Sequence, residues 1–375
     1  YTILNYFKIL FMSQIYSSLG MMSGTSFDGV DISIIETDGK DRILLKKDLY
    51  YPYDKQTKLN IKNFKNSLLN KNIASISKSK SFLELSRIIT LIHARSAKKI
   101  IENYKKKIDI IGFHGVTVLH KPEIKQSLQL GNPELLASLL KTNVVFNFRQ
   151  KDLDFGGQGA PLIPIYHKCL AKKLKNKKPC MFINIGGISN FTFISKNKFY
   201  ASDIGPGNCL LDQWIYLNTG KHFDENGRIS EKGKVDSNFV NNFMDRHDYY
   251  LKKNISYDTS DFNISELRGM SLENGAATLS YLSGILIANV INQYKNINNI
   301  YFGGGGRKNL FIMKTIQNNI IANIAILDEK KINGDFLESQ AFAYIAVRSL
   351  LKLPITFKQT TGVKKNVSGG EIYKY

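Results

Sequence analysis

The stretch GMMSGTSFDGVD, residues 20–31, decides the fold, because it places a Gly/Ser/Thr-rich turn between two strand-like runs. The apolar run before it and the alternating VDISIIETD after it predict a β-hairpin. LLKKDLYYPY, residues 44–53, predicts a third strand. From residue 58 to 107 the pattern predicts an amphipathic pair of helices, because apolar side chains and a histidine recur at spacings of three and four: Leu83, Leu85, Ile88, Ile89, Ile92 and His93.

The chain then continues as an α/β pattern that restarts halfway. IDIIGFHG and NVVFNF predict buried strands, with the helix PELLASLLKT between them. After a loop at 149–162, PCMFINIGGISNFTFI predicts a second strand–turn–strand unit, and 209–220 predicts a helix closed by a glycine. A polar stretch at 221–268 precedes further helices and strands. The sequence therefore predicts two α/β domains, one formed by residues 12–145 with 340–375 and the other by 146–339.

Bulk composition agrees with a globular protein that has more than one core. The 375 residues are 43% apolar and 22% charged, and the formal net charge is +21. The basic excess is dispersed along the chain, which favours solvated surface charge over a nucleic-acid partner. Three cysteines without a C-x-x-C pattern favour a reducing, cytoplasmic compartment, and no apolar run of 18 residues predicts a membrane span. Residues 1–11 are an N-terminal extension of uncertain status.

The first turn carries residues suited to a polyphosphate. Gly24 permits close backbone approach, and the hydroxyls of Thr25 and Ser26 can donate to phosphate oxygens. Asp28 can hold Mg²⁺ through water, since this ion prefers one or two carboxylates with retained waters and substrate phosphate. The alternative is an ordinary hairpin turn with Asp28 and Gly29 at its tip.

Two later glycine clusters have the same character. Gly186 and Gly187 lie between two predicted strands, and the run 303–306 follows the strand IYF and precedes a helix. Bare backbone at such a position suits a phosphate or a nucleotide face. Each cluster alone is as well explained by a turn, but three in one duplicated chain predict a nucleotide site.

Asp203 is the candidate catalytic base. It lies in DIGPGN at a predicted strand end, where ligands of open α/β sheets bind, and the positive end of the next helix is expected to keep it ionised. The alternative role is to cap that helix. Asp212, one turn further on, is interpreted as supporting packing.

Together these motifs resemble the anhydro-N-acetylmuramic acid kinase family. The resemblance spans nearly the whole chain from about residue 18, and GGQGAPL and DIGPGN are its specific parts. The matching stretches are GMMSGTSFDGVD (20–31), GFHGVTVLHKP (112–122), FRQKDLDFGGQGAPLIP (148–164), NIGGISNFT (184–192), DIGPGNCLLDQW (203–214), GGGGRKN (303–309), LESQAFAYIA (337–346) and TTGV (360–363).

The resemblance implies a two-domain actin-like ATPase fold of the ribonuclease H-like type, with ATP and Mg²⁺ in the cleft between the domains. The implied reaction phosphorylates O6 of 1,6-anhydro-N-acetylmuramic acid while water opens the anhydro bridge, as a step of peptidoglycan recycling. Asp203 is implied as the base for that water, and Gln158, Asn190 and Glu338 as residues near the sugar. The implied ATP-binding residues are Gly24, Thr25, Ser26, Asp28, Gly29, Asp31, Gly186, Gly187, Gly304 and Gly305.

The resemblance further implies a homodimer, with ATP and an anhydro amino sugar as partners and neither nucleic acid nor membrane. Two departures bear on the sugar: Asn147 stands where the family usually has Asp, and Val116 where it usually has Gln. A kinase of another hexose or amino sugar, whose Asp deprotonates an ordinary hydroxyl, is the main alternative. A basic nucleic-acid-binding protein is the remote one, since no recognition motif supports it.

Overall fold

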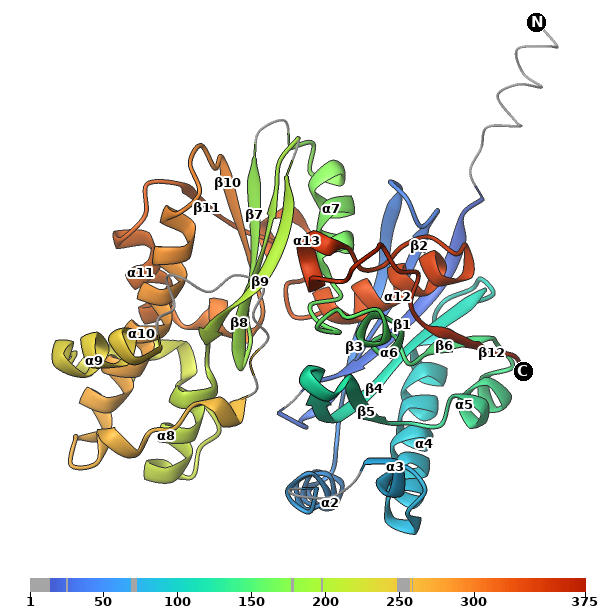
Figure 1. Ribbon diagram of the computed structural model, residues 1–375, viewed down its shortest axis with the longest axis horizontal. Helices are drawn as coiled ribbons and strands as arrows, with labels where there is room; N and C mark the ends of the chain where they lie inside the picture. Colours follow the sequence, from blue (N-terminus) through green and yellow to red (C-terminus); the bar gives the residue numbers. More distant parts are fainter. Residues whose placement is uncertain are drawn as a thin grey trace, which may run out of the picture.

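Two β-sheets, each covered by helices, organise the chain. The computed structural model describes residues 14–24, 26–68, 73–176, 179–196, 198–247, 257 and 259–375. Figure 1 shows one sheet in the half drawn in blue and teal and the other in the green and orange half, with α7 (Pro164–Lys173) and α12 (Leu337–Leu350) between them.

The remaining elements alternate along the chain as an α/β protein requires. The strands are β1 (Tyr16–Ser23), β2 (Gly29–Thr37), β3 (Ile43–Pro52), β4 (Ile110–Lys121), β5 (Gln126–Leu130), β6 (Val144–Phe146), β7 (Cys180–Ile185), β8 (Ile188–Ile194), β9 (Phe199–Pro206), β10 (Asn299–Gly303), β11 (Asn323–Ile326) and β12 (Glu371–Tyr373). The other helices are α2 (Lys55–Asn66), α3 (Ile73–Ile76), α4 (Lys80–Glu102), α5 (Pro133–Leu140), α6 (Gln150–Asp154), α8 (Cys209–Thr219), α9 (Ser237–His247), α10 (Leu272–Asn292), α11 (Leu310–Asn318) and α13 (Lys358–Thr361).

The two sheets repeat one topology. In the first, β1, β2 and β3 form an antiparallel meander, and β4 and then β6 add in parallel on the other side of β1. In the second, β7, β8 and β9 form the meander, and β10 and β11 add in parallel beside β7. When the hairpin strand β5 and the edge strand β12 are left out of the first sheet, both sheets have the order 3-2-1-4-5. This duplicated order is the ribonuclease H-like topology expected for an actin-like ATPase fold.

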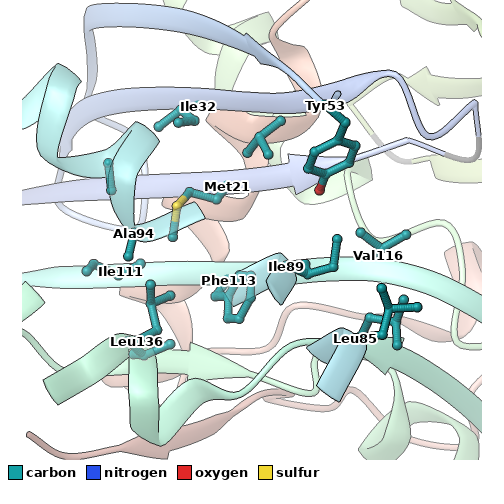
Figure 2. Close-up of a cluster of buried hydrophobic side chains, with 14 of the residues drawn as sticks. Met21, Ile32, Tyr53, Leu85, Ile89, Ala94, Ile111, Phe113, Val116 and Leu136 are labelled. Atoms are coloured by element: carbon teal, nitrogen blue, oxygen red, sulfur yellow. The ribbon is translucent and has the colours of Figure 1, made fainter. Parts of the chain in front are cut away.

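The central strands of the first sheet, β1, β2 and β4, are buried on both faces. Figure 2 shows one face, where Met21, Ile32 and Phe113 of the strands pack with Ile89 and other side chains of α4. On the other face α12 lies unusually close. A Cβ on Gly20 would meet the carbonyl oxygen of Ser339 at 2.0 Å, and one on Gly112 would meet that of Phe342 at 2.2 Å. Glycine at these two strand positions lets the helix backbone approach the sheet.

One hydrophobic core joins the two halves. It brings Ile110 and Val145 of the first sheet together with Phe182 of the second through side chains of α7 and α12, among them Tyr166 and Phe342. A separate core packs the far face of the second sheet against α8, α10 and α11. The two helices between the sheets thus fix the sheets relative to each other, so that the turns at their strand ends keep a common orientation.

The predicted elements are present, with some corrections. Leu85, Ile89 and His93 form the buried face of α4. Leu83 and Ile88, which the spacing grouped with them, are 55% and 40% exposed and lie outside that face. The loop expected at 149–162 contains α6, and the polar stretch at 221–268 contains α9. The short elements β5, α13 and β12 were not predicted. The predicted domain boundary at 145/146 lies within β6, and we keep the domain division as a proposal.

One helix of the described residues, α10, is long and apolar enough to span a membrane by length and composition. Its apolar window is 72% buried inside the protein, where it packs against α8, α11 and β9. These contacts make it a core helix.

Candidate active site

The turn between β1 and β2 keeps its charged side chain in solvent. Phe27 N–H donates to the Gly24 carbonyl oxygen at 3.1 Å and adopts a left-handed φ of 57°, which folds the turn back. Asp28 is largely exposed and accepts from Lys58 Nζ of α2 at 3.0 Å. Thr25 lies outside the described residues, so its predicted contact with phosphate stays a prediction. The turn therefore presents a carboxylate and an ammonium group together.

Two predicted phosphate-site residues, Gly29 and Asp31, lie within β2 instead of the turn. A Cβ on Gly29 would meet the Tyr51 carbonyl oxygen at 2.4 Å, so close strand packing explains this glycine. Asp31 is half-buried, and burial together with the nearby charges of Glu338 and Asp335 raises its pKa to about 7. Asp31 therefore lies where carboxylates from β2 and the start of α12 meet.

The turn between β7 and β8 offers backbone instead of charge. Gly207 N–H donates to the Gly187 carbonyl oxygen at 2.9 Å, and Asn208 N–H donates to that of Gly186 at 2.8 Å. A Cβ on Gly207 would meet the Gly186 carbonyl oxygen at 2.3 Å. The turn is thus held against the start of α8, and Gly186 itself stays partly exposed.

The third glycine cluster packs onto the end of β7. Gly304 has a φ of 78°, and a Cβ there would meet Asn184 Oδ1 at 2.5 Å. A Cβ on Gly306 would meet the Ile185 side chain at 2.2 Å, but one on Gly305 would meet nothing within 4 Å. The second and third clusters are therefore brought together, and Gly305 leaves open space beside them.

Asp203 lies inside β9, opposite Asn190 of β8. Its Oδ2 accepts from the Tyr257 backbone N–H at 2.9 Å. The N-cap of α8 is Asn208, so the interpretation of Asp203 as a helix cap is wrong. The sequence analysis expects the dipole of the next helix to keep Asp203 ionised, and burial acts in the opposite direction. Burial raises its pKa to about 7, and the opposing effects of the Tyr257 hydrogen bond and the Arg149 charge are smaller.

Arg149 connects Asp203, the candidate base, to the other half. It follows β6, and its charge interacts with those of Asp203 and Glu338. Its Nη1 donates to the Gly159 carbonyl oxygen at 2.8 Å, and its Nη2 and Nε lie 3.0 and 3.2 Å from His114 Nε2. Burial and the Arg149 charge lower the pKa of His114, so the imidazole is neutral and its Nε2 accepts. Sequence reasoning missed both residues, although each lies in a motif that carries the resemblance.

The GGQG loop is shaped by a buried carboxylate that sequence reasoning also missed. Asp152 of α6 is fully buried; its Oδ1 accepts from Gly159 N–H at 2.7 Å and its Oδ2 accepts from the Thr361 hydroxyl at 2.6 Å. Gln158 N–H donates to the Thr361 carbonyl oxygen at 2.8 Å, and its side chain is half-buried. Hydrogen bonds from α6 and α13 thus fix this loop. Gln158 belongs to the loop, and Arg149 donates to its Gly159 carbonyl oxygen.

Glu338 lies in the first turn of α12, half-buried between the two halves. Burial raises its pKa, while the Arg149 charge lowers it. Asp31 also feels the charge of Glu338. One chain of interacting charges therefore runs from Asp31 of the first sheet through Glu338 and Arg149 to Asp203 of the second.

A second electrostatic interaction between the two halves joins Asp212 and Asp28. Asp212 of α8 has a pKa raised to about 7 by burial and by the charges of Asp28 and Asp224. Asp212 is thus close enough to the first turn for the charge of Asp28 to raise its pKa. The sequence analysis interpreted Asp212 only as a packing residue. Within the described residues no group of three His, Cys, Asp or Glu could hold a metal ion. A cation here would have to complete its coordination with substrate oxygens and water.

The two departures from the family pattern, Val116 and Asn147, have other contacts in the structure. Val116 is fully buried in the core between the first sheet and α4, where Figure 2 shows it near Leu85 and Ile89. Asn147 is half-buried, and its Nδ2 donates to Glu371 Oε1 of β12 at 2.7 Å. In this structure neither side chain interacts with Asp203, Arg149 or Glu338.

The comparisons with known proteins agree on one family. The family model described as anhydro-N-acetylmuramic acid kinase matches residues 16–375. An anhydro-N-acetylmuramic acid kinase of Pelagibacter ubique is 44% identical over 377 residues, which cover 97% of this chain and 100% of that protein. One of Agrobacterium fabrum is 38% identical, with 97% and 100% covered.

Among solved structures, the Acidaminococcus fermentans (R)-2-hydroxyglutaryl-CoA dehydratase component A aligns over 90% of this chain and 100% of its own. That match has a TM-score of 0.47 and 10% identity, and we draw nothing from it. The family model and the two relatives, each matched over nearly its whole length, show that this chain belongs to the anhydro-N-acetylmuramic acid kinase family.

Proposed function

We propose that this protein uses ATP to phosphorylate O6 of 1,6-anhydro-N-acetylmuramic acid and adds water at C1, giving N-acetylmuramic acid 6-phosphate. The observation that carries the proposal is Asp203, a carboxylate with a pKa near 7 that shares Arg149 with Glu338 between two sheets ending in glycine turns. Family membership supplies the substrate, as printed for the relatives.

The chemistry needs a single base. O6 of the anhydro sugar is an ether oxygen and carries no proton. Water bonds to C1 and gives a proton to the Asp203 carboxylate; the C1–O6 bond breaks, O6 takes the γ-phosphoryl group, and ADP leaves. A base is most effective when its pKa lies near the working pH, which fits the value of about 7 for Asp203.

Arg149 is proposed to position this base and the sugar. Its charge opposes the effect of burial on the pKa values of Asp203 and Glu338, so both acids can ionise in a partly dry site. Neutral His114 and the Gly159 carbonyl accept from the guanidinium and fix its plane. Glu338, Asn190 and Gln158 are the proposed sugar-side residues, because they come from the three elements around Asp203 and Arg149.

ATP is proposed to lie with its phosphates between the two turns. Gly186, Gly187, Gly304 and Gly305 offer bare backbone on the second half, and Gly24, Thr25 and Ser26 offer backbone and hydroxyls on the first. Gly29 and Asp31 support the first turn from β2.

The residues present fit Mg²⁺. Asp28 and Asp212 interact through their charges across the two halves, and Lys58 pairs with Asp28, so two carboxylates and one ammonium group lie in the same region. Mg²⁺ prefers a site in which one or two carboxylates supply part of its coordination, and water and substrate phosphate supply the rest. When bound, Mg²⁺ supplies charge neutralisation for the transferred phosphoryl group. Asp28 would hold it through water.

Several finer properties belong to the same proposal. Cys169, Cys180 and Cys209 all lie in the described part of the chain and form no disulfide there, which supports a reducing cytoplasm. We propose a homodimer that acts on small molecules, without nucleic acid or membrane as partner, and the domains 12–145 with 340–375 and 146–339.

One assay tests the function. ATP consumption is measured with purified 1,6-anhydro-N-acetylmuramic acid, free N-acetylmuramic acid and N-acetylglucosamine, and the product is identified by mass spectrometry in ¹⁸O-water. We expect turnover of the anhydro sugar with one ¹⁸O at C1. Turnover of a free sugar alone would assign the protein to another hexose or amino-sugar kinase.

A further inference from the structure

A cavity of about 500 Å³ lies at the far end of the second sheet from Asp203. It is formed by the end of β8, the start of β9, α7, the residues after α10, and α13. Phe199 at its wall and Asp203 are four residues apart on β9, which places them about 13 Å apart along the strand. The cavity is therefore separate from the site described above.

The walls of this cavity are aromatic. Phe199 packs edge-on against Phe357 at 5.5 Å between ring centroids, and Tyr294 lies 4.6 Å from Phe193. Phe199, Tyr294 and Phe357 are all partly exposed, although the hydrophobic effect favours full burial of such large side chains. Half-exposed rings that face a shared hollow offer flat surfaces to a ligand.

The rim of the cavity is basic. Lys168 of α7, Lys196 and Lys198 line it, and no Asp or Glu does so among the described residues. None of the three ammonium groups forms an ion pair with any carboxylate that the structure describes. Lys168 Nζ lies 5.3 Å from the centre of the Phe199 ring, so an ammonium group and an aromatic ring are neighbours in this cavity.

We propose that this cavity is a second binding site, for a small anionic ligand that joins a phosphate group to a ring on which an aromatic side chain can pack, such as a nucleotide or a sugar phosphate. The lysines would bind the phosphate, and Phe199, Tyr294 and Phe357 would pack on the ring face. The volume falls within the range of small-molecule pockets, roughly 300–1,000 Å³. A concave site of this size holds one ring compound, whereas a nucleic-acid strand needs an extended groove.

The test compares binding of ADP and glucose 6-phosphate by titration calorimetry in the full-length protein. We expect at least one of the two probes to show a binding event that the double variant Lys196→Glu/Lys198→Glu weakens about tenfold or more. The matched control is Lys98→Glu/Lys99→Glu, an exposed lysine pair on α4 that should bind as the wild type does. Comparing the two probes distinguishes a nucleotide site from a sugar-phosphate site.

A second variant tests the ring contact. Phe199→Leu keeps an apolar side chain but removes the aromatic face, and we expect it to weaken the same binding event several-fold. Identical isotherms for the wild type and the Lys196/Lys198 variant with both probes would overturn the proposal. So would tight binding of a thymidine oligonucleotide that depends on these lysines while neither small probe binds.

Discussion

The turns that begin the two sheets occupy equivalent positions and differ in what they offer. The first, between β1 and β2, exposes the charged pair of Asp28 and Lys58. The second, between β7 and β8, consists of Gly186 and Gly187, and its carbonyl oxygens accept from backbone N–H groups. The second half instead carries its charge one strand further on, at Asp203. One topology thus places an exposed carboxylate and ammonium group on one side, and bare backbone with a half-buried carboxylate on the other.

Replacing the base of the second half should have the largest effect. Asp203→Asn keeps the shape of the side chain and its hydrogen bond from Tyr257, but it cannot accept a proton from water. We expect kcat to fall by roughly a hundredfold or more, with ATP affinity nearly unchanged. Steady-state kinetics and nucleotide titration measure the two quantities. Asp245→Asn, an exposed residue of α9, is the control, and near-normal turnover of Asp203→Asn would remove this residue from the chemistry.

Replacing the charge of the first turn should have a smaller effect. Asp28→Asn keeps a polar side chain but weakens the hold on Mg²⁺ through water. We expect the Mg²⁺ concentration needed for half-maximal activity to rise by about tenfold, as for other residues that act on a metal indirectly. Lys58→Ala removes the ion-pair partner of Asp28 and should leave this requirement unchanged or lower it. If Asp28→Asn left the Mg²⁺ requirement unaltered, the two turns would not differ in the way described above.

A methyl group on the second turn tests its bare backbone. In Gly186→Ala the new Cβ would meet the Ile188 carbonyl oxygen at 3.3 Å, a tight contact that needs a small shift, and Gly186 has no left-handed φ, so we expect only a small decrease in Tm. The KM for ATP should rise several-fold if the nucleotide lies against this backbone. Gly207→Ala is the contrasting variant, because its Cβ would meet a carbonyl oxygen at 2.3 Å and should lower Tm. An unchanged KM in Gly186→Ala would place the nucleotide elsewhere.

The pH dependence is the mildest test, because it changes protonation alone. Asp203 must be ionised to act as a base, so kcat/KM should rise with pH and level off above about 7. The positive charge of Arg149 lowers the pKa of Asp203, and Arg149→Met should therefore move this rise to higher pH. Arg149→Lys keeps the charge and should move it less. A pH profile that is flat between 5 and 8 would contradict the role of Asp203.

The same pKa shifts affect stability in a defined direction. The pKa values of Asp31, Asp203 and Asp212 are about 7 when folded and near 3.8 when unfolded, so the folded protein binds more protons between these values. Their contribution to the free energy of unfolding therefore falls as pH rises from about 4 to 7. This direction is opposite to that of a carboxylate in a salt bridge, and a pH titration of the free energy of unfolding checks it.

The sequence determined the elements and most of the site. Alternating apolar residues predicted the β1–β2 hairpin, and glycine runs predicted the turns at Gly186 and Gly304, because these signals are local. The family motifs singled out Asp203 and Glu338. Gly29, by contrast, was assigned to the phosphate site, whereas the close approach of Tyr51 explains it.

Only the tertiary structure decided how the charges act on one another. Arg149, His114 and Asp152 lie in motifs that carry the resemblance, but the motifs alone do not reveal their roles, which depend on residues far away in sequence, such as Thr361. Helix-dipole reasoning predicted an ionised Asp203, but burial between the sheets outweighs the dipole and brings its pKa to about 7. Desolvation depends on everything that packs around a group, and that packing exists only after α7 and α12 have joined the two halves of the chain.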